Sequence, residues 1–78
     1  MHSFYINVHT VQEVREFIDI ACTFPFDITV TDGSRSFNGK SLMGFFCLDP
    51  AHPMKVTALC TAEEFASFRQ AVGRFCSR

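Results

Sequence analysis

Residues 26–38 (F-D-I-T-V-T-D-G-S-R-S-F-N) carry the clearest folding signal in this protein. Apolar residues alternate with polar or charged ones over residues 26–31, and this period of two is typical of a strand with one buried face. Asp32-Gly33 follows directly and is a strong signal for a tight hairpin. Residues 35–38 are therefore expected to return as the antiparallel partner strand.

Two further elements are expected before this hairpin. Residues 4–8 alternate in the same way and predict a first strand. Thr10 and Glu13 have the spacing of a helix capping box, and Pro25 is expected to end that helix near Thr23. The apolar residues behind the box recur on one helical face: Val14, Phe17, Ile18 and Ala21.

Three elements are expected after the hairpin. Residues 41–48 form a short apolar segment that predicts a short helix, and residues 54–60 alternate as a fourth strand. Thr61 and Glu64 have the spacing of a second capping box and are expected to begin the last helix. The apolar face of that helix is a single seam: Phe65, Phe68, Val72 and Phe75.

The predicted order is therefore β-α-β-β-α-β-α in one domain spanning residues 1–78. Each strand alternates, and the first and last helices each have one apolar face. The economical packing places three helices on one face of a four-stranded antiparallel sheet. The sequence thus predicts an α+β open-faced sandwich.

Composition argues against several functional classes. Seven Lys and Arg against eight Asp and Glu give a net charge of −1, with no basic stripe of the kind that binds nucleic acid. No stretch approaches the ~18–20 apolar residues that a membrane span needs. The first ten residues contain no Lys or Arg and no long apolar run, so no signal peptide is expected. These observations predict a cytoplasmic protein.

The four cysteines contain no C-x-x-C pair, so neither a zinc site nor a dithiol redox motif is expected. We expect reduced thiols, with Cys22, Cys47 and Cys76 as small buried apolar residues. His2, His9 and His52 lack metal-ligand spacing. No Ser/His/Asp arrangement or phosphate-binding glycine loop is visible, so no metal, cofactor or enzymatic activity is predicted.

The element order, combined with G39-K-S-L-M-G-F-F-C-L48, resembles HPr, the histidine-containing phosphocarrier of the bacterial sugar phosphotransferase system. D27-I-T-V and K55-V-T-A match the family as well, and the resemblance runs from Ile6 to about Phe75. It implies the HPr fold and protein partners: Enzyme I, an HPr kinase or a transcriptional corepressor.

The first family site is a histidine at the start of the first helix, within a pattern like G-L-H-x-R-P-A, which accepts phosphate from phosphoenolpyruvate through Enzyme I. His9 is the nearest match, but anchoring on the helix places Thr10 at that position. Aligning His9 would need an insertion that rotates the apolar face by ~100°. Gln12 or Val11 stands where the family has its arginine, and Glu13 would repel a phosphoryl group. The resemblance is therefore to a member without phosphohistidine, similar to catabolite-repression HPr.

The second family site is the serine of K-S-[LI], which an ATP-dependent kinase phosphorylates in many bacterial members. Ser41 matches it residue for residue. A serine before a short helix is also a common N-cap, and the two roles are compatible. We predict Ser41 as a regulatory phosphorylation site.

Helical spacing divides the residues around Ser41 into two sets. Leu42, Phe45 and Leu48 lie three apart and are expected to face the core. The partner-binding patch of the family would comprise Lys40, Met43, Phe46 and Cys47, with burial of the whole segment as the alternative.

The resemblance predicts a regulatory protein that acts through protein–protein contacts of this patch, with or without phosphate on Ser41. The alternatives are a phosphocarrier that uses His9 and an unphosphorylated binding module. The expected state is a monomer or a weak homodimer.

Overall fold

A computed structural model describes residues 2–33, 35–46 and 53–76. The described elements follow the predicted order and end in a short 3₁₀ turn. Their bounds are β1 (His2–Ile6), α1 (Val11–Ala21), β2 (Ile28–Asp32), β3 (Arg35–Asn38), α2 (Leu42–Phe46), β4 (Met54–Ala58), α3 (Ala62–Ala71) and the 3₁₀ turn Gly73–Phe75.

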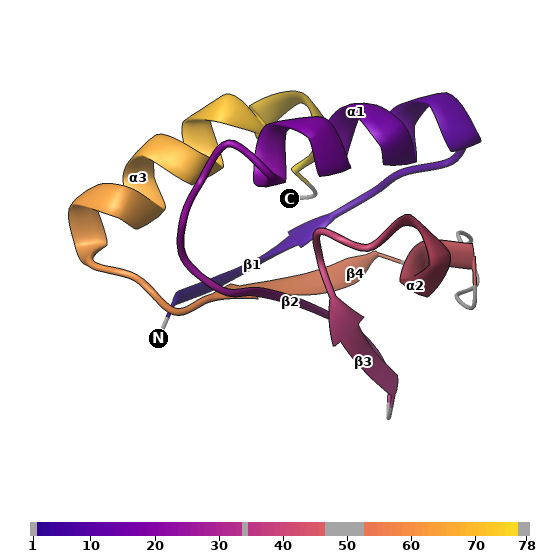
Figure 1. Cartoon of the computed structure of the whole chain (residues 1–78), viewed down its shortest axis with the longest axis horizontal. Coiled ribbons are helices and arrows are strands. Elements are labelled where there is room, and N and C mark those ends of the chain that lie inside the picture. Colours follow the sequence, from indigo (N-terminus) through magenta and orange to yellow (C-terminus); the bar gives the residue numbers. More distant parts are fainter. Residues whose placement is uncertain (1, 34, 47–52, 77–78) are drawn as a thin grey trace.

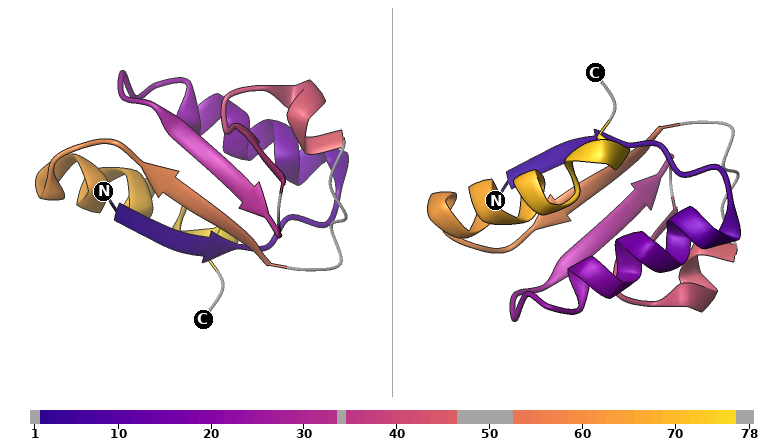
Figure 2. Two further views of the ribbon diagram at one scale, coloured as in Figure 1. Left: turned by 90° about the horizontal axis from the view of Figure 1, so that it is seen from below. Right: turned by 90° about the horizontal axis from the view of Figure 1, so that it is seen from above.

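The four strands form one antiparallel sheet in the order β1-β4-β2-β3. α1 and α3 lie side by side across one face of this sheet, and α2 lies beside α1 and β3 (Figures 1 and 2). The predicted α+β open-faced architecture is confirmed.

The β2–β3 hairpin forms with the predicted turn and returning strand. Asp32 pairs with Arg35, and Val30 pairs with Phe37. Gly33 has φ of 63°, a backbone conformation that side chains with a Cβ adopt at a cost, so the Asp-Gly signal has a direct structural reason.

The uncovered face of the sheet is polar. The register aligns its outward side chains in two rows across all four strands: Ser3, Thr57, Thr29 and Asn38 in one row, and Tyr5, Lys55, Thr31 and Ser36 in the other. Hydroxyl, amide and ammonium groups are stable in water, so this face needs no covering layer.

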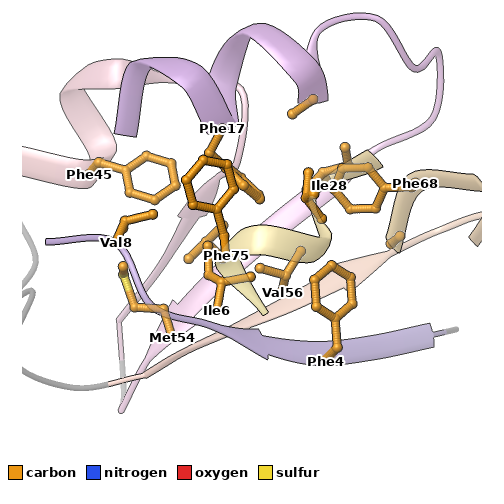
Figure 3. Close-up of a cluster of buried hydrophobic side chains, with 14 of the residues drawn as sticks. Phe4, Ile6, Val8, Phe17, Ile28, Phe45, Met54, Val56, Phe68 and Phe75 are labelled. Carbon is orange, nitrogen blue, oxygen red and sulfur yellow. The ribbon is translucent and has the colours of Figure 1, made fainter. Parts of the chain in front are cut away.

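Aromatic rings fill the space between the helices and the sheet (Figure 3). Phe17 of α1 and Phe68 of α3 are fully buried, and their ring centroids lie 6.2 Å apart. Phe17 also contacts Phe45 and Phe75 at 5.8 and 6.1 Å. One continuous core thus links all three helices to the sheet.

Several predicted boundaries were displaced by two or more residues. The first strand was predicted over residues 4–8, but β1 pairs with β4 only over residues 2–6. Beyond that point the N–H of Asn7 donates to the carbonyl of Phe75 at 2.7 Å, so the chain turns towards its C-terminal segment. Val8 stays buried outside the strand.

The last helix begins with a complete capping box. The Thr61 hydroxyl accepts from the N–H of Glu64 at 3.2 Å, and the Glu64 carboxylate accepts from the N–H of Thr61 at 3.0 Å. α3 ends at Ala71, and the 3₁₀ turn after it carries Phe75 into the core. The predicted apolar face of the last helix is therefore correct, although Phe75 belongs to the 3₁₀ turn and not to α3.

The prediction that Cys22 is buried was wrong. Cys22 is the C-cap of α1 and its side chain is exposed, because the helix face that meets the core ends at Ala21. Cys76 is half-buried. Cys47 lies outside the described residues.

We expect iodoacetamide to alkylate Cys22 faster than Cys60 or Cys76 at pH 8. Burial raises the pKa of both the Cys60 and Cys76 thiols, and Glu64 raises that of Cys60 further. Because the thiolate is the nucleophile, their alkylation rates should continue to rise with pH above the ordinary thiol range. Peptide mapping by mass spectrometry measures each site, and equal rates at pH 8 would contradict this expectation.

Candidate functional site

The segment of residues 39–48, of which the structure describes residues 39–46, begins with a tight turn that the side chain of Asn38 builds. The Asn38 side-chain oxygen accepts from the N–H of Lys40 at 2.9 Å, and the Asn38 carbonyl accepts from the N–H of Ser41 at 3.1 Å. Asparagine favours such a turn because its side chain imitates a backbone acceptor. This turn directs the chain from β3 into α2, with half-buried Ser41 immediately before the helix.

Both glycines of the segment lie where another atom would overlap a neighbour. A Cβ on Gly39 would lie 2.7 Å from Cγ2 of Ile28, and the N–H of Gly39 donates to the Ile28 carbonyl at 2.8 Å. A Cβ on Gly44 would overlap the ring of Phe37. α2 therefore packs directly on β3, which explains two of the family-like positions by close packing alone.

Lys40 makes a long-range contact within the fold. Its ammonium donates to the backbone carbonyl of Phe24 at 2.6 Å, and the side chain is half-buried. Phe24 lies in the loop after α1, residues 22–27. Hydrogen bonds that involve a charged group contribute about 1.5–3 kcal/mol net. A residue predicted for partner binding thus also fixes the start of α2 to the end of α1.

The core-facing set of α2 was predicted only in part. Phe45 is 5% exposed, and its ring meets Phe37 at 5.0 Å and Phe17 at 5.8 Å. Leu42 is 36% exposed, so its predicted burial was wrong. α2 reaches the core through Gly44 and Phe45, which leaves its first turn at the surface. Leu48 lies outside the described residues.

Exposed apolar side chains lie on α2 and at the start of α1, two helices that contact each other (Figures 1 and 2). Met43 is 79% exposed, and Val11, the first residue of α1, is 54% exposed. We call Val11, Leu42 and Met43 the α1–α2 apolar surface. The side chain of Phe46 and all of Cys47, both predicted for the patch, lie outside what the structure describes.

The sequence pattern did not identify Val11 as part of the candidate surface. A valine in the first turn fits the same apolar stripe as the buried face of α1, so periodicity predicts a core position for it. In the structure α2 contacts α1 through the rings of Phe45 and Phe17, and Val11 stays at the surface.

The N-terminus of α1 is occupied by its own side chains. The Thr10 hydroxyl accepts from the N–H of Glu13 at 3.1 Å, and the Glu13 carboxylate accepts from the N–H of His9 at 2.8 Å. The predicted capping box is thus present in a displaced form, with its return bond to His9 instead of Thr10. His9 itself is exposed. The Thr10 hydroxyl takes one of the first-turn amides that a phosphoryl group would use, and the Glu13 carboxylate would repel such a group.

The described parts of the chain offer neither a metal centre nor a membrane helix. Within residues 2–33, 35–46 and 53–76, no group of three or more His, Cys, Asp or Glu side chains is arranged to hold a metal ion. No helix in the same residues is both long and apolar enough to cross a bilayer.

Comparison with known proteins gives no family assignment: no family model and no curated protein matches the chain.

Proposed function

We propose that this protein is a regulatory member of the HPr family that docks onto other proteins through the α1–α2 apolar surface. The observation that carries the proposal is Met43, which is 79% exposed on a helix whose position close packing fixes. Exposed methionine suits a surface that meets several partners because its side chain adapts in shape. Leu42 is exposed next to Met43 on α2, and Val11 is exposed at the first residue of α1, the helix that α2 contacts.

Ser41 is the proposed regulatory site at the edge of this surface. A kinase would transfer the γ-phosphoryl group of ATP to the Ser41 oxygen, with release of ADP and the hydroxyl proton. The modification adds about −1.5 to −2 charges at pH 7. Such a charge beside Leu42 and Met43 would change which partners the surface accepts, by repelling acidic ones and attracting those with arginines.

One alternative is a phosphocarrier that accepts phosphate from Enzyme I on His9. The exposure of His9 favours this alternative. The Glu13 carboxylate, which holds the N–H of His9, weighs against it. An unphosphorylated binding module is the remaining possibility.

Mass spectrometry distinguishes the regulatory protein, the phosphocarrier and the unphosphorylated binding module. We expect an acid-stable phosphoryl adduct after incubation with an HPr kinase and ATP, and we expect Ser41→Ala to lose it. An acid-labile adduct formed with phosphoenolpyruvate and Enzyme I, and lost in His9→Ala, would establish the phosphocarrier instead. If neither reaction gives an adduct, the binding module becomes the better description.

Met43→Ser tests the docking surface itself. We expect the variant to lower kcat/KM for Ser41 phosphorylation by about tenfold or more, because hot-spot side chains contribute most of an interface's affinity. Tyr5→Ser is the matched control, since Tyr5 is 52% exposed on the opposite, uncovered face of the sheet. Equal rates for the two variants would contradict a docking role for Met43. Urea unfolding of both variants separates an effect on docking from a change in stability.

A further inference from the structure

We propose that Lys40 transmits phosphorylation of Ser41 to the loop after α1. The phosphoryl group takes the Lys40 ammonium away from the Phe24 carbonyl and so releases residues 22–27 from the start of α2. This inference rests on the proposed modification of Ser41, and it assigns that modification a defined structural consequence.

The contact that would be exchanged links distant parts of the chain. The Lys40 ammonium and the Phe24 carbonyl are 2.6 Å apart, although the residues are separated by 16 positions. The Lys40 backbone is held independently, because its N–H donates to the Asn38 side chain. The lysine side chain can therefore change partner while the turn remains in place.

The Lys40 ammonium is expected to reach a phosphoryl group on Ser41, because the two residues are adjacent in the chain. Adjacent Cα atoms lie about 3.8 Å apart, and the lysine side chain is flexible, with four carbons between its Cα atom and the ammonium. A phosphoryl group on Ser41 would offer three anionic acceptors, whereas the Phe24 carbonyl is neutral. Ion-paired hydrogen bonds are shorter and stronger than those to neutral acceptors. The ammonium is therefore expected to prefer the phosphoryl oxygens.

Loss of the bond between the Lys40 ammonium and the Phe24 carbonyl would loosen residues 22–27 without unfolding the domain. The Phe24 ring still packs against Phe26 and Phe68, with centroids 5.5 and 5.3 Å away. The freed carbonyl precedes exposed Pro25, so water can replace the ammonium. The amides of Thr23 and Phe24, which donate to Ile20 and Ala21 at 3.0 and 3.2 Å, would then open more often.

Phosphorylation of Ser41 transfers the γ-phosphoryl group of ATP to the serine oxygen. An oxygen–phosphorus bond forms at Ser41, the bond between the γ-phosphorus and its bridging oxygen in ATP breaks, ADP leaves, and the hydroxyl proton passes to the kinase or solvent. The response itself changes only hydrogen-bond partners.

Chemical synthesis of the phosphorylated protein tests the proposed role of Lys40 without a kinase. Residues 1–46, carrying phosphoserine at position 41 and a C-terminal thioester, can be ligated to residues 47–78 at Cys47. We expect hydrogen exchange at the Thr23 and Phe24 amides to accelerate by roughly tenfold, the effect of losing one charged hydrogen bond. The amide of Phe65, which donates to Thr61 in α3, should exchange at an unchanged rate and so exclude global destabilisation.

Two variants make the result specific. Lys40→Met should accelerate the same two amides without phosphate, and phosphate on Ser41 should then add nothing further. Phosphoserine at Ser36 adds the same charge to the uncovered face of the sheet and should leave both amides unchanged.

Unaltered exchange in the synthetic phosphoprotein, or equal acceleration by phosphate in Lys40→Met, would overturn the role of Lys40. A failed reaction with the HPr kinase would instead contradict the proposed function alone. The two failures are therefore distinguishable.

Discussion

Phe68→Ala is expected to lower the free energy of unfolding by about 3–5 kcal/mol, the cost typical of truncating a buried phenylalanine. A domain of this length has a total stability of only about 4–12 kcal/mol. The variant should therefore lose a large share of its stability.

The reason is the number of rings that meet Phe68. Its side chain is fully buried, so alanine would leave a cavity that neighbouring rings cannot fill without moving. The contacts come from β1, α1 and the loop after α1, with centroid distances of 5.7 Å to Phe4, 6.2 Å to Phe17, 5.3 Å to Phe24 and 5.9 Å to Phe26.

Urea unfolding followed by circular dichroism measures the effect. Phe65→Ala is the matched control on the same helix, since Phe65 is half-buried and packs mainly on His2 and Phe4. We expect Phe65→Ala to lower the free energy of unfolding by less than half as much as Phe68→Ala. A loss below about 1.5 kcal/mol for Phe68→Ala would mean that the core collapses around the cavity.

Gly44→Ala is expected to destabilise the protein by about 1–3 kcal/mol through overpacking. A Cβ at this position would lie 2.8 Å from Cγ of Phe37, and that atom is close to the backbone, so the ring cannot swing away easily. Alanine would gain about 1 kcal/mol over glycine from helix propensity in an open site. The overlap should exceed this gain because Phe37 also packs on Phe45.

Gly73→Ala supplies the control for Gly44→Ala. A Cβ on Gly73 meets no atom within 4 Å, so this variant should be neutral or slightly stabilised. Denaturation midpoints of the two variants, measured under the same conditions, give the comparison. If Gly44→Ala were as stable as Gly73→Ala, α2 would not pack on Phe37 in the way the structure describes.

Local signals predicted the elements because each depends on neighbouring residues. Asp32-Gly33 forms a turn by its own backbone preferences, and Thr61 caps a helix through a residue three positions away. Strand ends were predicted less well. β1 ends at Ile6, and the next residue, Asn7, bonds to Phe75, a contact with no signature in the residues around Asn7.

In the candidate site, too, some features follow from neighbouring residues and others from contacts between distant residues. Burial of Phe45 and exposure of Met43 follow from helical spacing, and both predictions were confirmed. The exposure of Leu42 and Val11 depends on how far α2 extends over α1. The bond from Lys40 to Phe24 joins residues that are distant in sequence, so no local pattern could predict it.

The sequence by itself determined the order of the elements, the hairpin, the helix starts and which strand face is apolar. These features follow from backbone preferences and from the periods of strands and helices, which act over a few residues. Only the tertiary structure decided which apolar side chains stay in water and where the Lys40 ammonium binds. Those outcomes depend on the packing of α2 against α1 and β3, which is set by close contacts at Gly44, Phe45 and Phe37.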